Sequence, residues 1–248
     1  MKFKKINIGN HSILHIQVVN DLELLKRAEQ FARSKSPNVK TGDPSGRERK
    51  QSELFSQNFL GSLADIVCAE VLTKYMNKHN HPIEVLQYDE VRTDNFLNPD
   101  MYDIKLINNN NEYIVEVRSS ACIYLSLEAM IMKWQVLGPY SSETKGGFED
   151  DKAFYIRPLY HLKSYEKNRT DKHYTRSSGI DLVKSGDLNL YIVGGATSEI
   201  MNKKGRNESG EELKQGKSEF KVVDIKDALD ANDFLKTVSE TITSDNNY

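Results

Sequence analysis

Two carboxylates, Asp103 and Glu116, are the residues of this chain that are best placed to do chemistry together. They lie in two short segments, YDIKLI at 102–107 and EYIVEVRS at 112–119, in which charged and apolar side chains alternate. Such alternation is typical of strands with one apolar and one charged face. The segments are separated by asparagines at 108–111, and because asparagine tolerates positive φ, a hairpin is predicted there. Closure of this hairpin would bring the two carboxylates close together on the charged face.

Two neighbouring carboxylates repel each other unless a cation lies between them. Carboxylate oxygens suit Mg²⁺, and Mn²⁺ is the second possibility. Lys105 and Arg118 share the charged face, so either could offset the negative charge that develops on a phosphate. The pattern therefore indicates a site for metal-dependent phosphodiester hydrolysis, although a hairpin with one face in water has the same alternation.

The run from Asp103-Ile104 through the hairpin to Glu116-Val117-Arg118-Ser119-Ser120 resembles the PD-(D/E)XK nuclease superfamily. That superfamily includes type II restriction endonucleases and Holliday-junction resolvases. The resemblance implies a mixed sheet flanked by helices, with Asp103 and Glu116 as Mg²⁺ ligands. It also makes the Val117 carbonyl a further ligand.

The chain departs from the superfamily at one position, because Arg118 stands where the superfamily has lysine. Arginine keeps its proton at physiological pH, so Arg118 cannot be a general base. Its planar guanidinium can still bind the scissile phosphate. Two other interpretations stay open, namely that Lys105 replaces the missing lysine or that the site binds nucleic acid without cutting it.

The acidic ligands have rivals in the sequence. Pro99-Asp100 supplies a literal Pro-Asp pair, but Asp103 is preferred because it precedes an apolar strand. The run GSLADI at 61–66 resembles the superfamily's helix that brings a further acid to the metal. Asp65 matches that position best and Glu70 is second, and helical periodicity does not choose between them.

A basic segment at 162–176, LKSYEKNRTDKHYTR, is the candidate for contact with double-stranded DNA. Its cationic residues are Lys163, Lys167, Arg169, Lys172 and Arg176. Cutting both strands needs two active sites, which type II restriction enzymes commonly supply as a homodimer. We therefore expect a sequence-specific DNA endonuclease. A binding-only protein of the same fold, or a resolvase-like or RNA nuclease, is the alternative.

The helices and strands expected from the sequence position these residues. Their order along the chain predicts an α/β (α+β) fold with a central mixed sheet flanked by helices. Helices are expected at 21–33, 56–78, 126–133, 197–202 and 227–238. Further strands are expected at 12–19, 84–92, 152–157, 188–193 and 220–225, and a long exposed loop at 35–52. We predict one nuclease domain over residues 1–248, with a catalytic core at about 56–157 and recognition elements at about 158–240.

Composition excludes several classes of protein. The 248 residues carry 34 Lys and Arg against 36 Asp and Glu, a net charge of −2, so the chain is not a wholly polybasic binder. No apolar run is long enough to span a membrane, and no secretory signal is visible. The two cysteines, Cys68 and Cys122, form no disulfide framework and suggest reduced core residues of a cytoplasmic protein.

Overall fold

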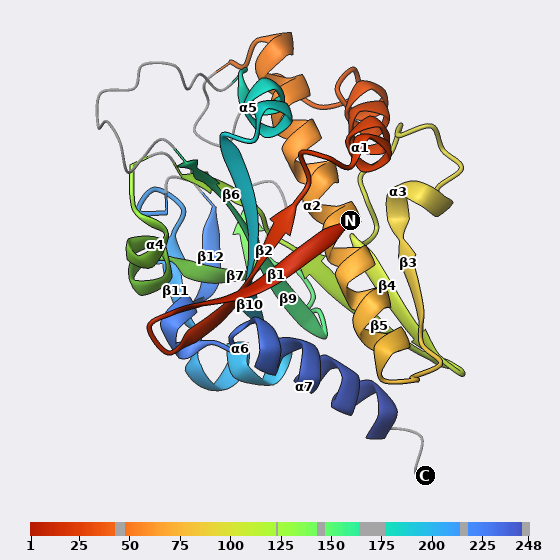
Figure 1. Ribbon diagram of the computed structural model, residues 1–248, viewed down its shortest axis with the longest axis vertical. Coiled ribbons are helices and arrows are strands. Elements are labelled where there is room, and N and C mark those ends of the chain that lie inside the picture. The colour runs from red at the N-terminus through yellow and green to blue at the C-terminus, as the bar shows by residue number, and fades with distance from the viewer. Residues whose placement is uncertain (43–47, 123, 143–146, 164–176, 214–217, 245–248) are drawn as a thin grey trace.

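An eight-stranded mixed sheet lies at the centre of the computed structural model of the chain (Figure 1). Its strands follow the order β1-β2-β10-β9-β5-β4-β3, and β6 also pairs with β9. The β5–β9 and β6–β9 pairs are parallel, and the other pairs are antiparallel. The structure describes residues 1–248 apart from 43–47, 123, 143–146, 164–176, 214–217 and 245–248. The strands of this sheet are β1 (Lys2–Ile8), β2 (His11–Gln17), β3 (Glu84–Gln87), β4 (Ile104–Asn108), β5 (Asn111–Val117), β6 (Ser120–Cys122), β9 (Phe154–Leu162) and β10 (Leu188–Thr197).

Long helices cover one face of this sheet (Figure 1). They are α1 (Leu22–Lys35), α2 (Gln51–Lys78), α5 (Gly179–Ser185) and α7 (Ala231–Ser244). On α2, Leu63, Val67 and Val71 are fully buried in the larger apolar core. Asp21 caps α1 by accepting a hydrogen bond from Leu24 N at 3.2 Å, which fixes where that helix begins.

A second layer covers the opposite face of the sheet. It contains α4 (Leu127–Lys133), α6 (Ser198–Lys204) and a four-stranded sheet of order β11-β12-β7-β8. Its strands are β7 (Gln135–Ser142), β8 (Gly147–Phe148), β11 (Arg206–Ser209) and β12 (Glu219–Asp224). Residues such as Met130, Val136 and Met201 pack here against Tyr155 and Leu159 of the large sheet. The predicted class, a single mixed α/β domain with a central mixed sheet, is therefore confirmed.

Strand β9 is buried on both faces because it lies between these two layers. Phe154 and Ile156 face the larger core, whereas Tyr155 and Leu159 face the second one. The strand also carries Arg157, which is only 3% exposed. A charged residue in such a place needs an explanation, since burial of a charge is costly unless it is paired.

Two predicted elements differ from the structure. Only the first half of 84–92 is a strand, and the chain then forms the short helix α3 (Tyr88–Val91). The strand expected at 188–193 is longer in the structure, because β10 continues through Gly194-Gly195 to Thr197 with a shift in register. Gly194 has φ of +122°, and a Cβ at Gly195 would lie 2.2 Å from the Tyr155 carbonyl oxygen. Glycine is therefore needed for close backbone approach inside the sheet.

Other expectations agree with the structure. The asparagine segment closes the β4–β5 hairpin with Asn108 opposite Asn111, and Asn109 has φ of +54°. Cys68 and Cys122 are buried and free. Within the described part of the chain, no helix has the length and apolar character required to cross a membrane.

Candidate active site at the end of the β4–β5 hairpin

The β4–β5 register brings Asp103 and Glu116 together as predicted. Ile104 lies opposite Val115, so one further step along the hairpin places Asp103 opposite Glu116. The backbone N–H of Val117 donates a hydrogen bond of 2.6 Å to Asp103 Oδ2. This bond joins the Asp103 carboxylate to the end of β5, directly before the first residue of β4.

The pKa of Asp103 is raised to about 7. Burial is the main cause, and the negative charge of Glu116 is the next. The Val117 N–H and the charges of Arg118 and Lys35 oppose this rise. Two carboxylates therefore lie close enough to disfavour each other's ionisation, which is the electrostatic situation that a bound cation relieves.

Helix α2 adds a third carboxylate from Asp65. Its pKa is raised well above the ordinary value, first by burial and then by the charge of Asp103. Glu70, the rival on the same helix, forms ion pairs with Arg27 at 3.3 Å and Lys74 at 3.9 Å instead. Of the two acids, the structure brings Asp65 to the hairpin.

Arg118 is held between two carboxylates. Its Nη2 lies 2.9 Å from Glu116 Oε1 and 2.9 Å from Glu149 Oε2. Its guanidinium also lies over the ring of Tyr140, at 5.0 Å from the centroid. Arg118 therefore faces the same site as Glu116, but its charge is offset by two acids. Glu149 was not predicted, because it lies outside the hairpin and follows a segment without regular pattern.

Lys105, in contrast, pairs with an acid outside this group. Its Nζ forms an ion pair of 2.7 Å with Glu112 Oε2 and lies 5.0 Å from the centroid of the Tyr102 ring. Lys105 shares a strand face with Asp103, as expected, but a neighbouring carboxylate holds its ammonium. The hypothesis that Lys105 replaces the missing lysine is therefore not supported by the geometry.

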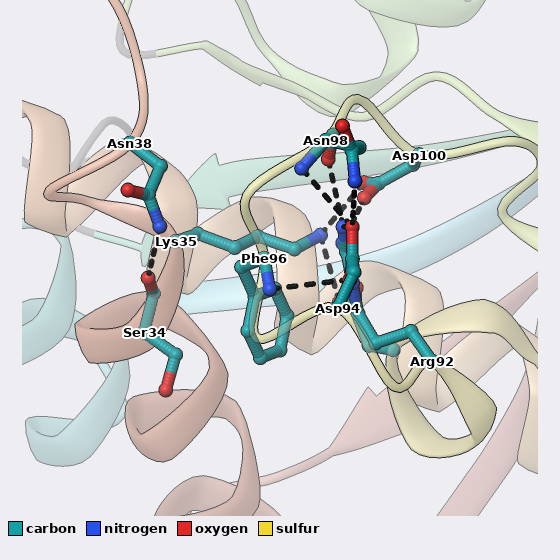
Figure 2. A network of polar contacts seen from close by, with 9 residues as sticks. Ser34, Lys35, Asn38, Arg92, Asp94, Phe96, Asn98 and Asp100 are labelled. Atoms are coloured by element: carbon teal, nitrogen blue, oxygen red, sulfur yellow. Dashed lines mark hydrogen bonds and ion pairs between the residues drawn. The ribbon is translucent and has the colours of Figure 1, made fainter.

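The lysine that acts on this site is Lys35. It was assigned to an exposed loop, but it is the last residue of α1 and its side chain is 14% exposed. Its Nζ lies 2.7 Å from Asp89 Oδ2 and 3.0 Å from Asp100 Oδ2. Figure 2 shows Lys35 extending from the helix toward Asp100. Its pKa is raised by Asp65, Asp89 and Asp100 despite burial, so it is the internal counter-ion of these acids.

Asp100 belongs to a network that folds the segment before β4 (Figure 2). Arg92, whose side chain is 2% exposed, pairs with Asp94 at 2.7 Å, with Asp89 at 3.4 Å and with Asp100. It also donates a 2.7 Å hydrogen bond to the Asn98 carbonyl. These contacts give Asp100 a structural role and support Asp103 as the hairpin acid.

Arg157 approaches the site from β9. Its Nη1 donates a hydrogen bond to the Arg118 carbonyl, and its guanidinium lies 6.0 Å from the centroid of the Trp134 ring. Burial, followed by the charge of Arg118, lowers the pKa of Arg157 to about 9. Arg157 is the last residue of the strand expected at 152–157, and the sequence predicts no site role for it.

The predicted DNA-contacting segment is described only in part. Lys163 follows β9, is exposed, and its backbone N–H donates to the Asp187 carbonyl at 2.7 Å. Lys167, Arg169, Lys172 and Arg176 lie outside the described residues.

Asp103, Glu116 and Asp65 are the residues that could hold a metal ion. Among the residues whose placement is described, no three His, Cys, Asp or Glu side chains form a ready-made metal cage. Mg²⁺ commonly keeps several water ligands and binds through one or two carboxylates, so a pair of acids is a sufficient protein contribution.

Comparisons with family models, curated proteins and solved structures found no match.

Proposed function

We propose that the chain is a metal-dependent phosphodiester hydrolase that acts on DNA. The observation that carries the proposal is the Asp103–Glu116 pair at the end of the hairpin, with Asp65 of α2 close enough for the charge of Asp103 to raise its pKa. A structural hairpin in water does not need buried acids whose pKa values are raised by neighbouring acids. Acids whose pKa values are raised in this way, and which lie near one another, are typical of a functional site.

The donor set fits Mg²⁺, because it consists of carboxylate oxygens whose repulsion a divalent cation would offset. Asp103 and Glu116 would hold the ion, and the Val117 carbonyl and Asp65 are the further candidates. When bound, the ion would supply an acidified water and a polarised phosphate. The Val117 N–H keeps the Asp103 carboxylate in one orientation for that purpose.

Arg118 would bind the phosphate through its guanidinium, since it cannot accept a proton. In the structure its Nη2 is shared by Glu116 and Glu149. Binding of a cation by Glu116 would weaken that ion pair and leave donors of Arg118 for a phosphate oxygen. Arg118 and the cation therefore cooperate in this proposal, and neither acts alone.

The finer assignment is a sequence-specific enzyme of restriction type that cuts double-stranded DNA as a homodimer. It is supported by the resemblance described above and by the basic segment at 162–176. A two-fold dimer would place two equal sites on the two strands of a duplex.

One observation favours a second function, a nuclease-like protein that binds nucleic acid without cutting it. The superfamily's lysine is absent, and the arginine in its place is neutralised by two carboxylates. Branched DNA or RNA as substrate is a further alternative within the hydrolase class.

Incubation of the protein with plasmid and phage DNA in Mg²⁺, Mn²⁺ or EDTA tests the proposal. Discrete fragments that require metal support a sequence-specific endonuclease, and a metal-dependent smear supports a nonspecific one. Intact DNA together with a gel shift supports the binding protein instead. If the DNA stays intact and shows no gel shift, the same assay is repeated with RNA and with branched DNA.

A further inference from the structure

Two buried arginines of this protein have opposite electrostatic surroundings. The side chain of Arg92 is 2% exposed and pairs with Asp89, Asp94 and Asp100. Arg157 is 3% exposed, and no carboxylate in the described part of the chain forms an ion pair with it. Its described hydrogen-bond partner is a neutral acceptor, the Arg118 carbonyl. Its Nε is buried without any hydrogen-bond partner.

A buried guanidinium without an anion is unfavourable. Removal of a charge from water costs several kcal/mol unless a partner of opposite charge replaces the solvent. Arg157 instead lies close to a second cation, Arg118, whose charge contributes to the lowered pKa of Arg157. The Nε of Arg118 is likewise buried and unpartnered. Two neighbouring arginines, each with a buried Nε donor that is not used, form an arrangement that an anion can complete.

The charges of the site show what Arg157 adds. The acids that act on Arg118 are Glu116, Glu149 and Asp103, and Arg157 is a second cation near Arg118. These five groups carry one negative charge more than positive when all are ionised, and Asp65 is left out of the count because Lys35 offsets it. A divalent cation would make the group net positive. Without Arg157, the same cation would only bring the net charge of the group to zero. The group would then attract an anionic phosphate only weakly.

We propose that Arg157 is the positioning residue of an anion subsite at Arg118, fixing the main chain of that arginine and supplying the charge that lets it bind a backbone phosphate of nucleic acid. The assignment of the anion as a nucleic-acid phosphate rests on the proposed function. The subsite itself rests on the burial of Arg157, its bond to Arg118 and its lack of a carboxylate partner in the described residues.

Replacement of Arg157 separates this role from a structural one. Arg157→Met keeps the length of the side chain and removes the charge, and Arg157→Lys keeps the charge. If the positive charge of Arg157 serves to bind an anion, it is unfavourable when no anion is bound. Arg157→Met should then raise the melting temperature in chloride buffer by about 2 °C or more. The stabilising effect of inorganic phosphate at matched ionic strength should disappear in the same variant. A residue with a structural role alone would lower the melting temperature and leave the phosphate effect intact.

Binding of a fluorescent DNA duplex is the second readout. Measured in Ca²⁺, which takes oxygen ligands, anisotropy should show about tenfold weaker binding for Arg157→Met, with partial recovery in Arg157→Lys. Arg92→Met is the control, because it removes an arginine whose side chain is also little exposed but which has carboxylate partners. It should lower the melting temperature and keep the response to phosphate.

The results distinguish this inference from the proposed function. If the wild-type protein cuts DNA but Arg157→Met is destabilised with unchanged phosphate and duplex binding, the inference is wrong and the hydrolase proposal stands. If no nucleic acid is cut but the variant is stabilised and loses the phosphate response, the anion subsite stands without the hydrolase.

Discussion

The backbone N–H of Val117 donates a 2.6 Å hydrogen bond to the carboxylate of Asp103, which joins β5 to the residue that precedes β4. This bond holds an acid with a raised pKa opposite a second acid, Glu116. The two acids are therefore held together before any ligand binds, and the electrostatic cost of ionising Asp103 can be measured as a dependence of stability on pH.

Asp103 makes the stability of the protein depend on pH. Its pKa is 3.8 for the isolated group and about 7 in the folded protein, so the folded state binds more protons between these values. Stability should therefore fall as pH rises from about 4 to about 7, by roughly 1 kcal/mol or more. Asp103→Asn removes this loss, and urea unfolding in EDTA at several pH values measures it.

The control for this experiment is Asp181→Asn, which changes an exposed aspartate on α5. Its pH profile should follow that of the wild-type protein. Mg²⁺ at about pH 8 should restore stability to the wild-type protein and not to Asp103→Asn. Parallel pH profiles of wild type and Asp103→Asn would show that Asp103 is an ordinary solvated acid.

Lys35 should stabilise the acids around it. Lys35→Met removes a cation that acts on Asp65, Asp89 and Asp100, although Arg92 still pairs with the last two, and we expect a loss of about 1–3 kcal/mol at about pH 8. The loss should shrink as the pH falls, because burial raises the pKa of Asp65 and of Asp89 and so favours their neutral forms. Lys236→Met removes an exposed pair with Glu240 and should change stability by less than about 0.5 kcal/mol. Equal effects of the two variants would contradict this role of Lys35.

Sequence alone predicted the hairpin because its signals are local. Alternation and the asparagine turn act within one short stretch, so they specify the pairing of Asp103 with Glu116 without reference to the rest of the chain. Lys35 carried a weaker signal, because it continues the buried stripe of Ala28 and Ala32 at helical spacing. Its charge made an exposed loop the natural interpretation.

Glu149 and Arg157 could not be assigned from the sequence. The position of Arg157 depends on the parallel pairing of β9 with β5, which joins segments separated by a long connection. Glu149 follows β8, and its position depends on the pairing of β8 with β7. Arg157 did carry one signal, a charged residue within an otherwise apolar strand. Such a residue has a specific reason for its burial, but the sequence does not say which group it faces.

Two glycines test the packing of the central sheet. A Cβ at Gly195 would meet the Tyr155 carbonyl oxygen at 2.2 Å and the Phe234 ring at 2.6 Å, so Gly195→Ala should cost about 2 kcal/mol or more. Gly61 lies inside α2 with open space at its Cβ, so Gly61→Ala should stabilise the protein by about 0.5–1 kcal/mol. Thermal unfolding measures both, and effects of the same sign would show that the β9–β10 contact is described incorrectly.

The central claim is that Glu116 and Asp103 form a metal-dependent nuclease site, and matched variants of two glutamates on β5 test it most directly. Glu116 lies opposite Asp103, whereas Glu112 is on the same strand face at its exposed end and pairs with Lys105. The measurement is the initial rate of DNA cleavage in Mg²⁺, with EDTA as the blank. Because loss of groups beyond the metal ligands already costs about 10- to 100-fold, Glu116→Gln should lose at least about 100-fold. Glu112→Gln should retain the wild-type rate. Equal rates for the two variants, or cleavage that persists in EDTA, would contradict the account.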